Sequence, residues 1–555
     1  MGTQGPFSGI AAKAANKFAH RFLSEYSLCI LLFILALIIR LPYLYDVPRF
    51  IDEWREIELS AKIARGELWP LHNTSHDIGP FHNYMLAGLF SIFGYNVYIP
   101  RLYVAILSAA TVVIIYLIVR HWEGKLTAWI AALLLTTNAM HILVTHMAWS
   151  NDTTPFFVGL AILITLKTID QERWLLWAIT GIAWAIALQT HPSVAAVLLG
   201  VAFYLGRHFG WRAFYRKTSF RVAAIAFIAG YSNMIVHNVI NPLDSVLWVK
   251  RKEYALNQDW TVQTYLSNIA EMGRELVYSL SSTFPDGQGW LHTLSLWMIV
   301  PFLIGLVDGF RRLRAHRHGG MLLAILVSSF LVIPVLNDQY LFYVWTRYIA
   351  YLFPICFVAI AIAFSAWIRQ MASSFSQRSW ILVSGSLMAF GWAVVLILPL
   401  YHFYSYAESY IETGQDNTAE FLAVQTLQEK NTTQSPIVVD KQVKQAEAVS
   451  KMLRVNGFSS PLVGIDPNEV REVQATQSNF GEGLDSTFYA RWRKVLSKNK
   501  PDTWYVLTLD NKNKITELFD ITWRDEEIIK GESGKLTYFI GRMTVSKSGK
   551  KQPDS

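Results

Sequence analysis

The stretch YSLCILLFILALIIRLPYLY, residues 26–45, decides the fold, because it is apolar and long enough to cross a lipid bilayer. No small-residue cleavage site follows it, so we interpret it as a retained membrane-spanning helix and not as a cleaved signal peptide. The rest of the chain has the same character. Of its 555 residues, 52% are hydrophobic and only 16% are charged, which is more apolar surface than one soluble core can bury.

Ten further apolar stretches of spanning length follow the first. Their approximate bounds are 97–120, 126–145, 153–168, 174–190, 192–207, 220–240, 291–310, 320–336, 347–367 and 380–402. The sequence therefore predicts a mainly α, polytopic membrane protein with about eleven transmembrane helices.

Positive charges recur in every second connection between these stretches. They include Lys13, Lys17 and Arg21 before the first span and Arg or Lys near residues 120–125, 167–173, 207–221, 311–317 and 369–378. The short connections at 146–152, 190–192 and 337–345 contain neither Lys nor Arg. Because positive loops stay in the cytoplasm, we expect the N-terminus inside and these three connections outside. The net charge of +8 is then explained by the basic residues of the cytoplasmic connections, and we expect no nucleic-acid partner.

Three larger segments are predicted on the outer side: loops at about 46–96 and 241–290, and a C-terminal segment from residue 404. The C-terminal segment has strand-like apolar runs at 436–439 and 504–509 and a helical pattern at 418–428. We therefore divide the chain into a transmembrane domain, 1–403, and a small extracytoplasmic soluble α/β domain, 404–555. The three outer segments can meet in space.

The first outer loop opens with Asp52-Glu53-Trp54-Arg55. The spacing predicts a helix from Trp54 to Ala64, lying along the membrane surface with Ile57 on its apolar face. Asp52 and Glu53 would begin this helix, where the helix dipole favours anions. Capping alone is a sufficient explanation of both carboxylates if nothing else is considered.

Helix capping does not explain why several further motifs follow the acidic pair in a particular order. The first span and the acidic pair are followed by the turn Ala64–Trp69, an aromatic helix ending in Leu89–Gly94, Pro100-Arg101-Leu102, Asp152 before Pro155-Phe156-Phe157, and Arg347-Tyr348 through Pro354. In this order they resemble the protein O-mannosyltransferase and aminoarabinose transferase family of GT-C glycosyltransferases. The resemblance is strongest over residues 26–170. It implies a GT-C-like bundle.

The family resemblance implies a reaction. The donor would be a polyprenyl-phosphate-linked monosaccharide, whose anomeric carbon an acceptor attacks in one inverting displacement at the outer membrane face. Such chemistry needs a carboxylate for the acceptor's proton and a cation for the departing phosphate. By its match to the first position of the family's acidic pair, Asp52 is expected to be the general base. Glu53 would orient that base or the acceptor.

Candidates for the phosphate and the sugar come from several loops. Arginine binds phosphate oxygens in a bidentate fork, which favours Arg55 and Arg347, the latter beside Tyr348. Lys250, Arg251 and Lys252 are further cations, for which a basic patch beside anionic lipid headgroups is the competing explanation. Snorkelling to the interface is the competing explanation for Arg347.

The loop before the aromatic helix departs from the family pattern. Ile78-Gly79-Pro80 stands where many relatives carry Lys-Pro-Pro, and Asp77 falls where a second acidic residue is often found. The missing Lys leaves His76 and His82 as substitutes for its contact to the donor phosphate, with plain interfacial histidines as the alternative. Asp152 completes the set of expected substrate-binding residues.

A divalent metal ion is an option that the residues leave open, since Asp52, Asp77 and Asp152 could supply oxygen ligands at the outer face. No other cofactor is expected, and Cys29 and Cys356 support neither a disulfide nor a thiolate site. The acceptor could be a protein, a lipid or a glycan, and membrane lipids are expected partners. We expect a multi-pass protein of a bacterial plasma membrane, although an organelle membrane would leave the same pattern.

A polytopic transporter or lipid flippase is the alternative function. It would place ionisable residues near the membrane midplane, close to a substrate path. The predicted spans carry almost no Asp, Glu, Lys or Arg in their middles, and the charge is concentrated at one surface. This distribution favours surface chemistry.

Overall fold

The computed structural model describes residues 25–48, 52–251, 261–283, 290–316, 318–336, 346–374, 378–415, 417–443, 445–463, 480–498, 502–519, 521–531, 534 and 536–545. Predictions that rest on Lys13, Lys17, Arg21, Lys252 or the connection 337–345 lie outside these residues, as do the side chains of Lys250 and Arg251.

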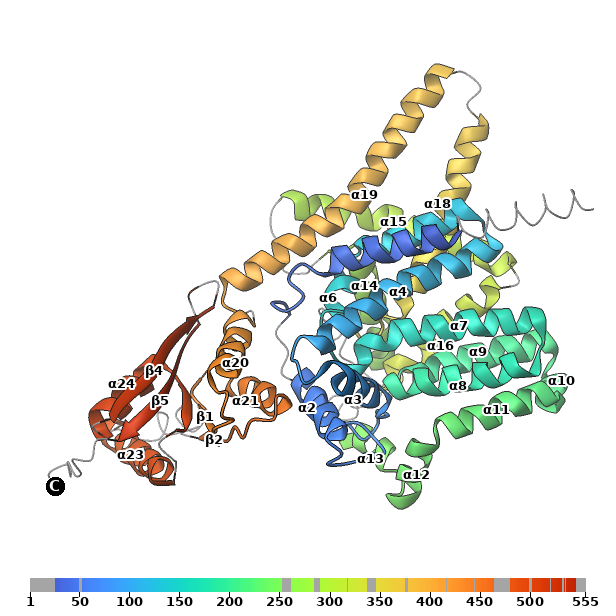
Figure 1. Cartoon of the computed structure of the whole chain (residues 1–555). Helices are drawn as coiled ribbons and strands as arrows, with labels where there is room; N and C mark the ends of the chain where they lie inside the picture. Colours follow the sequence, from blue (N-terminus) through green and yellow to red (C-terminus); the bar gives the residue numbers. More distant parts are fainter. Residues whose placement is uncertain are drawn as a thin grey trace, which may run out of the picture.

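Most of the chain is a bundle of helices, which starts with helical residues 25–40 (Figure 1). The helices that follow are α2 Asp52–Ala64, α3 Phe81–Phe93, α4 Ile99–Trp122, α5 Lys125–Thr137, α6 Ala139–Val144, the 3₁₀ helix η1 Ser150–Thr153, α7 Thr154–Gln171, α8 Trp174–Thr190, α9 Val194–Phe209, α10 Trp211–Arg216, α11 Thr218–Gly230, α12 Ser232–Ile240, α13 Asp244–Arg251, α14 Val262–Leu280, α15 Trp290–Ala315, α16 Gly319–Leu336, α18 Leu352–Ser374 and α19 Arg378–Glu412.

The prediction of eleven membrane spans is not confirmed. Within the described residues, three helices are long and apolar enough to cross a membrane: Ile99–Trp122, Ser150–Gln171 and Leu352–Ser373. The pair α11 and α12, bent by 60°, makes a fourth if it counts as one span. Helices α5, α8, α9 and α16 are apolar but shorter than the roughly 20 residues of a straight crossing.

Breaks in the backbone explain why several predicted spans are shorter than expected. The stretch 126–145 is divided at Asn138, whose side-chain oxygen accepts a hydrogen bond from the backbone N–H of His141 and so starts α6. The stretch 220–240 bends between α11 and α12, and α18 begins only at Leu352. The outer segment 241–290 contains two helices, α13 and α14, so it is not a simple loop.

Glycines allow the helices of the bundle to pack closely. A Cβ atom at Gly181 of α8 would lie 2.1 Å from the carbonyl oxygen of Ala223 in α11. One at Gly309 of α15 would lie 1.9 Å from the carbonyl oxygen of Ala359 in α18. Backbone therefore touches backbone at these crossings, as is common between membrane helices.

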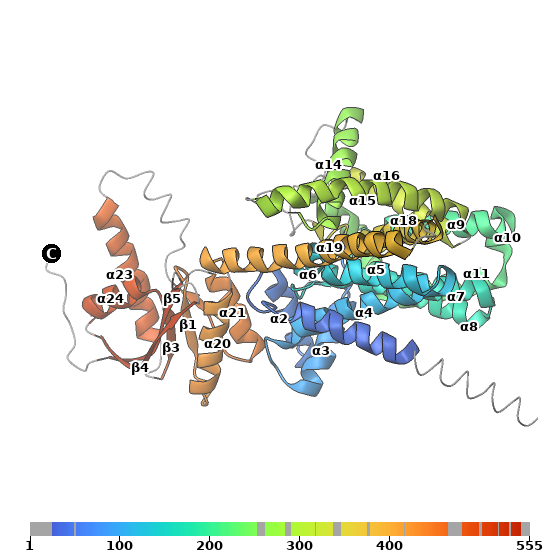
Figure 2. The same cartoon turned by 90° about the horizontal axis from the view of Figure 1, so that it is seen from above.

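The basic connections meet at one end of the bundle. His316, after α15, lies 2.9 Å from the carboxylate of Glu123 between α4 and α5, and Lys217 lies 2.8 Å from Glu172 between α7 and α8. Figure 2 shows α10 at the end of the bundle farthest from the C-terminal strands. The connections predicted to be cytoplasmic thus lie together, as one membrane face requires.

The C-terminal part contains a mixed five-stranded sheet in the order β2-β1-β3-β5-β4, which confirms the predicted small C-terminal sheet. Its elements are α20 Thr418–Lys430, β1 Ile437–Asp440, α21 Ala446–Val455, β2 Leu462–Val463, α23 Phe480–Lys498, β3 Trp504–Leu507, α24 Leu509–Phe519, β4 Ile521–Lys530 and β5 Thr537–Val545. β1 pairs in parallel with β2 and β3, and β5 pairs antiparallel with β3 and β4.

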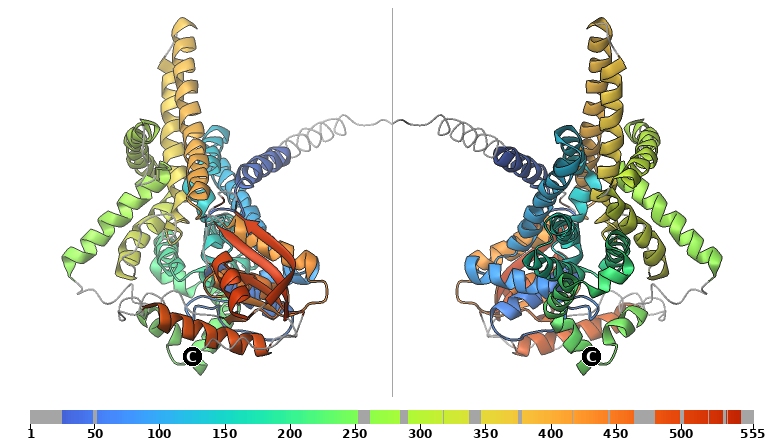
Figure 3. Two further views of the ribbon diagram at one scale, coloured as in Figure 1. Left: turned by 90° about the vertical axis from the view of Figure 1, so that its left-hand side faces the viewer. Right: turned by 90° about the vertical axis from the view of Figure 1, so that its right-hand side faces the viewer.

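Helix α19 runs past the expected boundary at residue 404 without a break and leads from the bundle to the C-terminal part. There α20 and α21 lie beside α2, at the end of the bundle opposite to α10 (Figures 1 and 2). Viewed along the bundle, the sheet lies across this end (Figure 3). Phe421 of α20 packs its ring 5.6 Å from that of Trp54 and 5.1 Å from that of Tyr98, so the two parts share an aromatic core.

Candidate active site

Helix α2 begins at Asp52, as its acidic first turn predicts, and has Lys62 in its last turn. Trp54, Ile57 and Ala61 have no exposed surface. We expected a helix lying open on the membrane surface, but α2 is enclosed by α3 on one side and by α21 on another. Its acidic residues therefore face protein partners.

Glu53 forms an ion pair with Arg101 at the start of α4, and both side chains are 0% exposed. The Nε atom of Arg101 lies 3.2 Å from Glu53, and the guanidinium also donates to the backbone oxygens of Leu44 and Pro48 at 3.0 and 2.9 Å. The same carboxylate accepts the backbone N–H of Ala148 at 2.8 Å. Glu53 thus joins α2, α4 and the connection before η1.

Glu56, one helical turn after Glu53, is a buried carboxylate that the sequence analysis did not single out. It accepts the backbone N–H of Ser150 at 3.0 Å and the hydroxyl of Ser150 at 3.2 Å. Burial raises the pKa of Glu56 to about 7, although the hydrogen bonds from Asn73 and Ser150 oppose this shift. The spacing of three residues from Glu53 was the only signal in the sequence that could have found it.

The connection held by these two carboxylates ends in Asp152. The side chain of Asp152 is 2% exposed, and among the described residues neither carboxylate oxygen makes a hydrogen bond of good geometry, although the backbone of Trp149 favours its charged form. Arg347, Glu53 and Glu56 are the charged groups that interact with it electrostatically. Burying a carboxylate with so few hydrogen bonds is costly, so this arrangement is typical of a functional site.

Arg347 lies in the non-helical segment before α18 and is 2% exposed. Its guanidinium carbon lies 4.0 Å from the centre of the Trp149 ring and 4.9 Å from that of Tyr348. The Tyr348 ring in turn stacks on His191 at 4.9 Å. Burial among aromatic rings beside Asp152 rules out the explanation that Arg347 snorkels into solvent.

Asp52 and Arg55 lie at the border between the bundle and the C-terminal part. The two side chains are 44% and 53% exposed, and they approach each other to 3.6 Å. Arg55 also lies 3.5 Å from Glu447 of α21. Asp52 is therefore accessible, in contrast to Glu53, Glu56 and Asp152.

The loop around Ile78 and Gly79, which departs from the family pattern, is buried and packs against Gln189. Ile78, at the position where the resemblance led us to expect Lys, is 2% exposed and has no side-chain donor for a phosphate. The N–H of Gly79 donates to Gln189 at 3.0 Å, and a Cβ atom there would lie 2.5 Å from the Gln189 side chain. Proline at position 79 would lose that hydrogen bond and clash, which accounts for the glycine.

The remaining candidates of this loop have separate surroundings. Asp77 is buried and interacts electrostatically with Tyr231. His82 is buried, its Nε2 atom lies 3.3 Å from the carbonyl oxygen of Ala148, and burial lowers its pKa to about 4. His76 pairs with Asp244 at 2.6 Å and stacks on Trp248.

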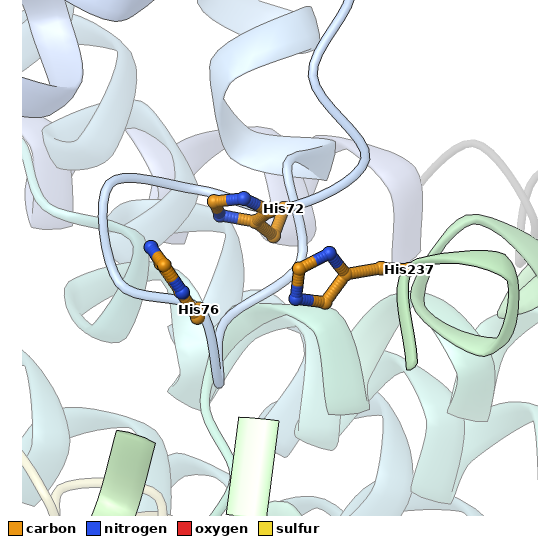
Figure 4. Close-up of side chains that lie close together, drawn as sticks. All are labelled: His72, His76 and His237. Atoms are coloured by element: carbon orange, nitrogen blue, oxygen red, sulfur yellow. The ribbon is translucent and has the colours of Figure 1, made fainter. Parts of the chain in front are cut away.

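The expected metal ligands are not the group that the structure brings together. Among the described residues, the set whose ligand atoms all lie within 4.8 Å of one another is His72, His76 and His237. Figure 4 shows these three rings gathered between the connection that precedes α3 and helix α12. Of the site residues expected from the sequence, Glu53, Asp152 and Arg347 meet in one cluster, and His76 belongs to another.

Comparison with known proteins supports the reading of the motifs. Residues 77–236 match the family model described as dolichyl-phosphate-mannose-protein mannosyltransferase. This segment contains Asp77, His82 and Asp152, whereas Asp52 and Glu53 precede it. No curated protein sequence matches the chain.

Solved structures share the fold. ArnT from Cupriavidus metallidurans bound to undecaprenyl phosphate is similar with a TM-score of 0.58 and 14% identity, over 94% of this chain and 98% of that chain. The apo state of the same protein is similar with a TM-score of 0.54 and 14% identity, over 95% of this chain and 98% of that chain. The oligosaccharyltransferase of Archaeoglobus fulgidus in the apo form is similar with a TM-score of 0.51 and 12% identity, over 89% of this chain and 70% of that chain. Residues 77–236 are thus similar to that mannosyltransferase family, and the chain as a whole shares the fold of these solved structures.

Proposed function

We propose that this protein transfers a monosaccharide from a polyprenyl-phosphate-linked donor to an acceptor at the outer face of a bacterial plasma membrane. The observation that carries the proposal is the buried carboxylate of Asp152, which interacts electrostatically with Arg347 and with Glu53. Glu53 adjoins Asp52 in the first turn of α2, and the carboxylate of Asp52 is accessible. The likeness to a structure of ArnT bound to undecaprenyl phosphate supports the same class of donor.

In the proposed reaction, the acceptor's nucleophilic oxygen attacks the anomeric carbon while the bond from that carbon to the phosphate oxygen breaks. The electron pair of the breaking bond leaves with polyprenyl phosphate, and the configuration at the anomeric carbon inverts. Asp52 takes the proton of the acceptor, since it is the carboxylate that an incoming acceptor can reach from solvent. The products are the glycosylated acceptor and polyprenyl phosphate.

The leaving phosphate gains negative charge as the bond breaks, so a fixed cation nearby lowers the barrier. Arg347 is assigned this role because its guanidinium is held between Trp149 and Tyr348 in a buried setting, where charge-assisted hydrogen bonds are strong. Asp152 would keep that guanidinium in place in the absence of substrate. Arg55 is a second cation, on the side of Asp52.

Glu53 is assigned a positioning role in the proposal. Its ion pair with Arg101 fixes the first turn of α2, and with it the direction in which Asp52 points. Both oxygens of Glu53 are engaged, one with Arg101 and the other with Arg101 and Ala148, so it has no further oxygen to offer an acceptor.

A carboxylate metal site remains a proposal. Asp152 fits a divalent cation in one respect, because its two buried oxygens make no hydrogen bond of good geometry in the described part of the chain. A cation bound there would neutralise phosphate charge. Asp52 and Asp77 are the other carboxylates that could contribute.

The outer-face assignment rests on the charge distribution. The basic connections lie together at the end of the bundle that contains α10, and the proposed site lies at the opposite end with α2 and the C-terminal sheet. By the positive-inside rule the site then faces away from the cytoplasm. In the proposed division of the chain, residues 404–555 form an extracytoplasmic domain that covers α2.

Membranes from cells that express the protein test this function. They would be supplied with a panel of undecaprenyl-phosphate-linked hexoses and pentoses, and mass spectrometry would follow undecaprenyl phosphate and glycosylated products. We expect protein-dependent release of undecaprenyl phosphate from at least one donor, with the sugar recovered on an acceptor. Translocation of intact donor across proteoliposomes, without any release, would instead support the flippase alternative.

A further inference from the structure

We propose that His72, His76, His237 and Asp244 form a binding site for a divalent transition-metal ion of the zinc type, which ties the connection between α2 and α3 to the segment α12–α13. This site is separate from the Asp152 and Arg347 cluster, and the inference does not depend on the proposed transfer reaction.

Geometry is the first support. One ligand atom from each of the three histidines lies within 4.8 Å of the others, the spacing of groups around a common centre. The rings are also close, with centroids of His72 and His237 4.4 Å apart and those of His72 and His76 4.3 Å apart (Figure 4). Asp244 completes the set, since its Oδ2 atom lies 2.6 Å from Nδ1 of His76 and 3.1 Å from Nε2 of His237.

The chemistry of these donors selects the metal. Three imidazoles with one carboxylate suit Zn²⁺ and similar ions, which take four ligands in a tetrahedron, whereas Mg²⁺ and Ca²⁺ prefer sets of oxygen atoms. Placing three imidazole rings in mutual contact has no evident packing benefit that apolar side chains would not supply better. A shared cation accounts for their convergence.

Residues around the proposed ligands orient their side chains, as hydrogen bonds to the ligands do in known metal sites. Nδ1 of His72 lies 2.5 Å from the backbone oxygen of Asn73, which leaves Nε2 for a metal. The His76 ring stacks on Trp248 at 4.1 Å and 15°. Ser245, next to Asp244, donates its hydroxyl to the backbone oxygen of His76 at 2.7 Å. These contacts orient His72 and His76, and those of Trp248 and Ser245 come from the segment that contains Asp244.

The position of the site indicates its role. His72 and His76 belong to the loop that contains Asp77, whereas His237 lies in α12 and Asp244 begins α13. A metal ion would therefore crosslink parts of the chain that are 168 residues apart in sequence, as the pair His76 and Asp244 already does. Its expected effect is to stabilise this outer end of the bundle.

Metal analysis of the purified protein in detergent tests the site. After removal of metal with EDTA, Co²⁺ would be added, because tetrahedral Co²⁺ absorbs visible light more strongly than octahedral Co²⁺. We expect one Co²⁺ per chain with a tetrahedral spectrum, displacement by Zn²⁺, and a lower unfolding temperature in EDTA. His72→Gln and Asp244→Asn, both at partly exposed positions, should each lower the affinity about 10- to 100-fold.

His121→Gln is the matched control. His121 is an exposed histidine that also pairs with a carboxylate, that of Asp170 at 3.3 Å, but it lies at the opposite end of α4 from the proposed active site. It should bind Co²⁺ as the wild type does. The proposal is overturned if the wild type takes up no Co²⁺ or Zn²⁺ above background, or if the double variant His72→Gln/Asp244→Asn retains the tetrahedral spectrum. Sugar transfer is not part of this readout, so its loss or survival leaves the test unaffected.

Discussion

Glu53 and Arg101 form an ion pair in which neither side chain is exposed to solvent. The pair joins the start of α2 to the start of α4, two elements that are 48 residues apart in sequence. One carboxylate of the acidic pair Asp52-Glu53 is thereby turned inward, and its neighbour Asp52 is left at the surface.

Breaking this pair should destabilise the protein. Glu53→Gln leaves the guanidinium of Arg101 buried without a counter-charge, which costs about 3–5 kcal/mol. Thermal unfolding in detergent measures the loss. Glu67→Gln, which breaks the exposed pair of Glu67 and Arg65, is the control and should change the unfolding temperature little. Equal small shifts in both variants would show that the buried pair does not hold α2.

Glu56 should make stability depend on pH. Because burial raises its pKa from 4.5 to about 7, the native protein keeps a proton that the unfolded chain has already lost. The contribution of Glu56 to stability is therefore full below about pH 4.5 and is lost as the pH rises to about 7, by about 3 kcal/mol in all. Glu56→Gln removes this dependence. The unfolding temperature of the variant minus that of the wild type should therefore increase as the pH is raised from 5 to about 8. Parallel pH curves for the two proteins would contradict the assignment.

Arg347 should bind the phosphate of the lipid carrier. Arg347→Lys keeps the charge but loses the planar fork and the stacking on Trp149, so affinity for undecaprenyl phosphate should fall about tenfold or more. Binding to the purified protein can be followed by native mass spectrometry. Arg369→Lys is the control, since Arg369 donates to Thr127 near the other end of the bundle. The same loss in both variants would mean that the effect is not local.

Phe421 should hold the C-terminal sheet against α2. Phe421→Ala opens a cavity beside Trp54 and Tyr98, at a cost of about 3–5 kcal/mol. Limited proteolysis should then cut the chain faster near residues 413–417, where α19 ends. Leu422→Ala changes the next residue, which is 42% exposed, and should leave the digestion pattern unchanged. Unchanged digestion of the Phe421 variant would show that other contacts dock the sheet.

Local signals in the sequence predicted the elements that depend on them. The acidic first turn at Asp52 gave the start of α2, and the apolar runs at 436–439 and 504–509 correspond to β1 and β3. Motif order also predicted the GT-C fold. These features are encoded within a few residues of where they occur.

Features that depend on distant contacts could not be predicted. The break at Asn138 is stabilised by its side-chain amide, which donates to Ser279 and Ser282 about one hundred and forty residues away. Glu56 acquires its perturbed pKa only when the Ser150 segment folds over it. His237 and Asp244 lie in a region without any recognised motif, so their contact with His72 and His76 could not be predicted from the sequence.

Turnover by Asp52→Asn tests the central claim most directly. Release of undecaprenyl phosphate from the active donor would be measured in isolated membranes, with Asp525→Asn as the control, because Asp525 is likewise a partly exposed aspartate paired with an arginine. We predict that the control retains activity while Asp52→Asn, expressed and folded normally, loses about 10²- to 10⁴-fold in rate. Wild-type turnover by Asp52→Asn would contradict the assignment of Asp52 as the base that accepts the proton.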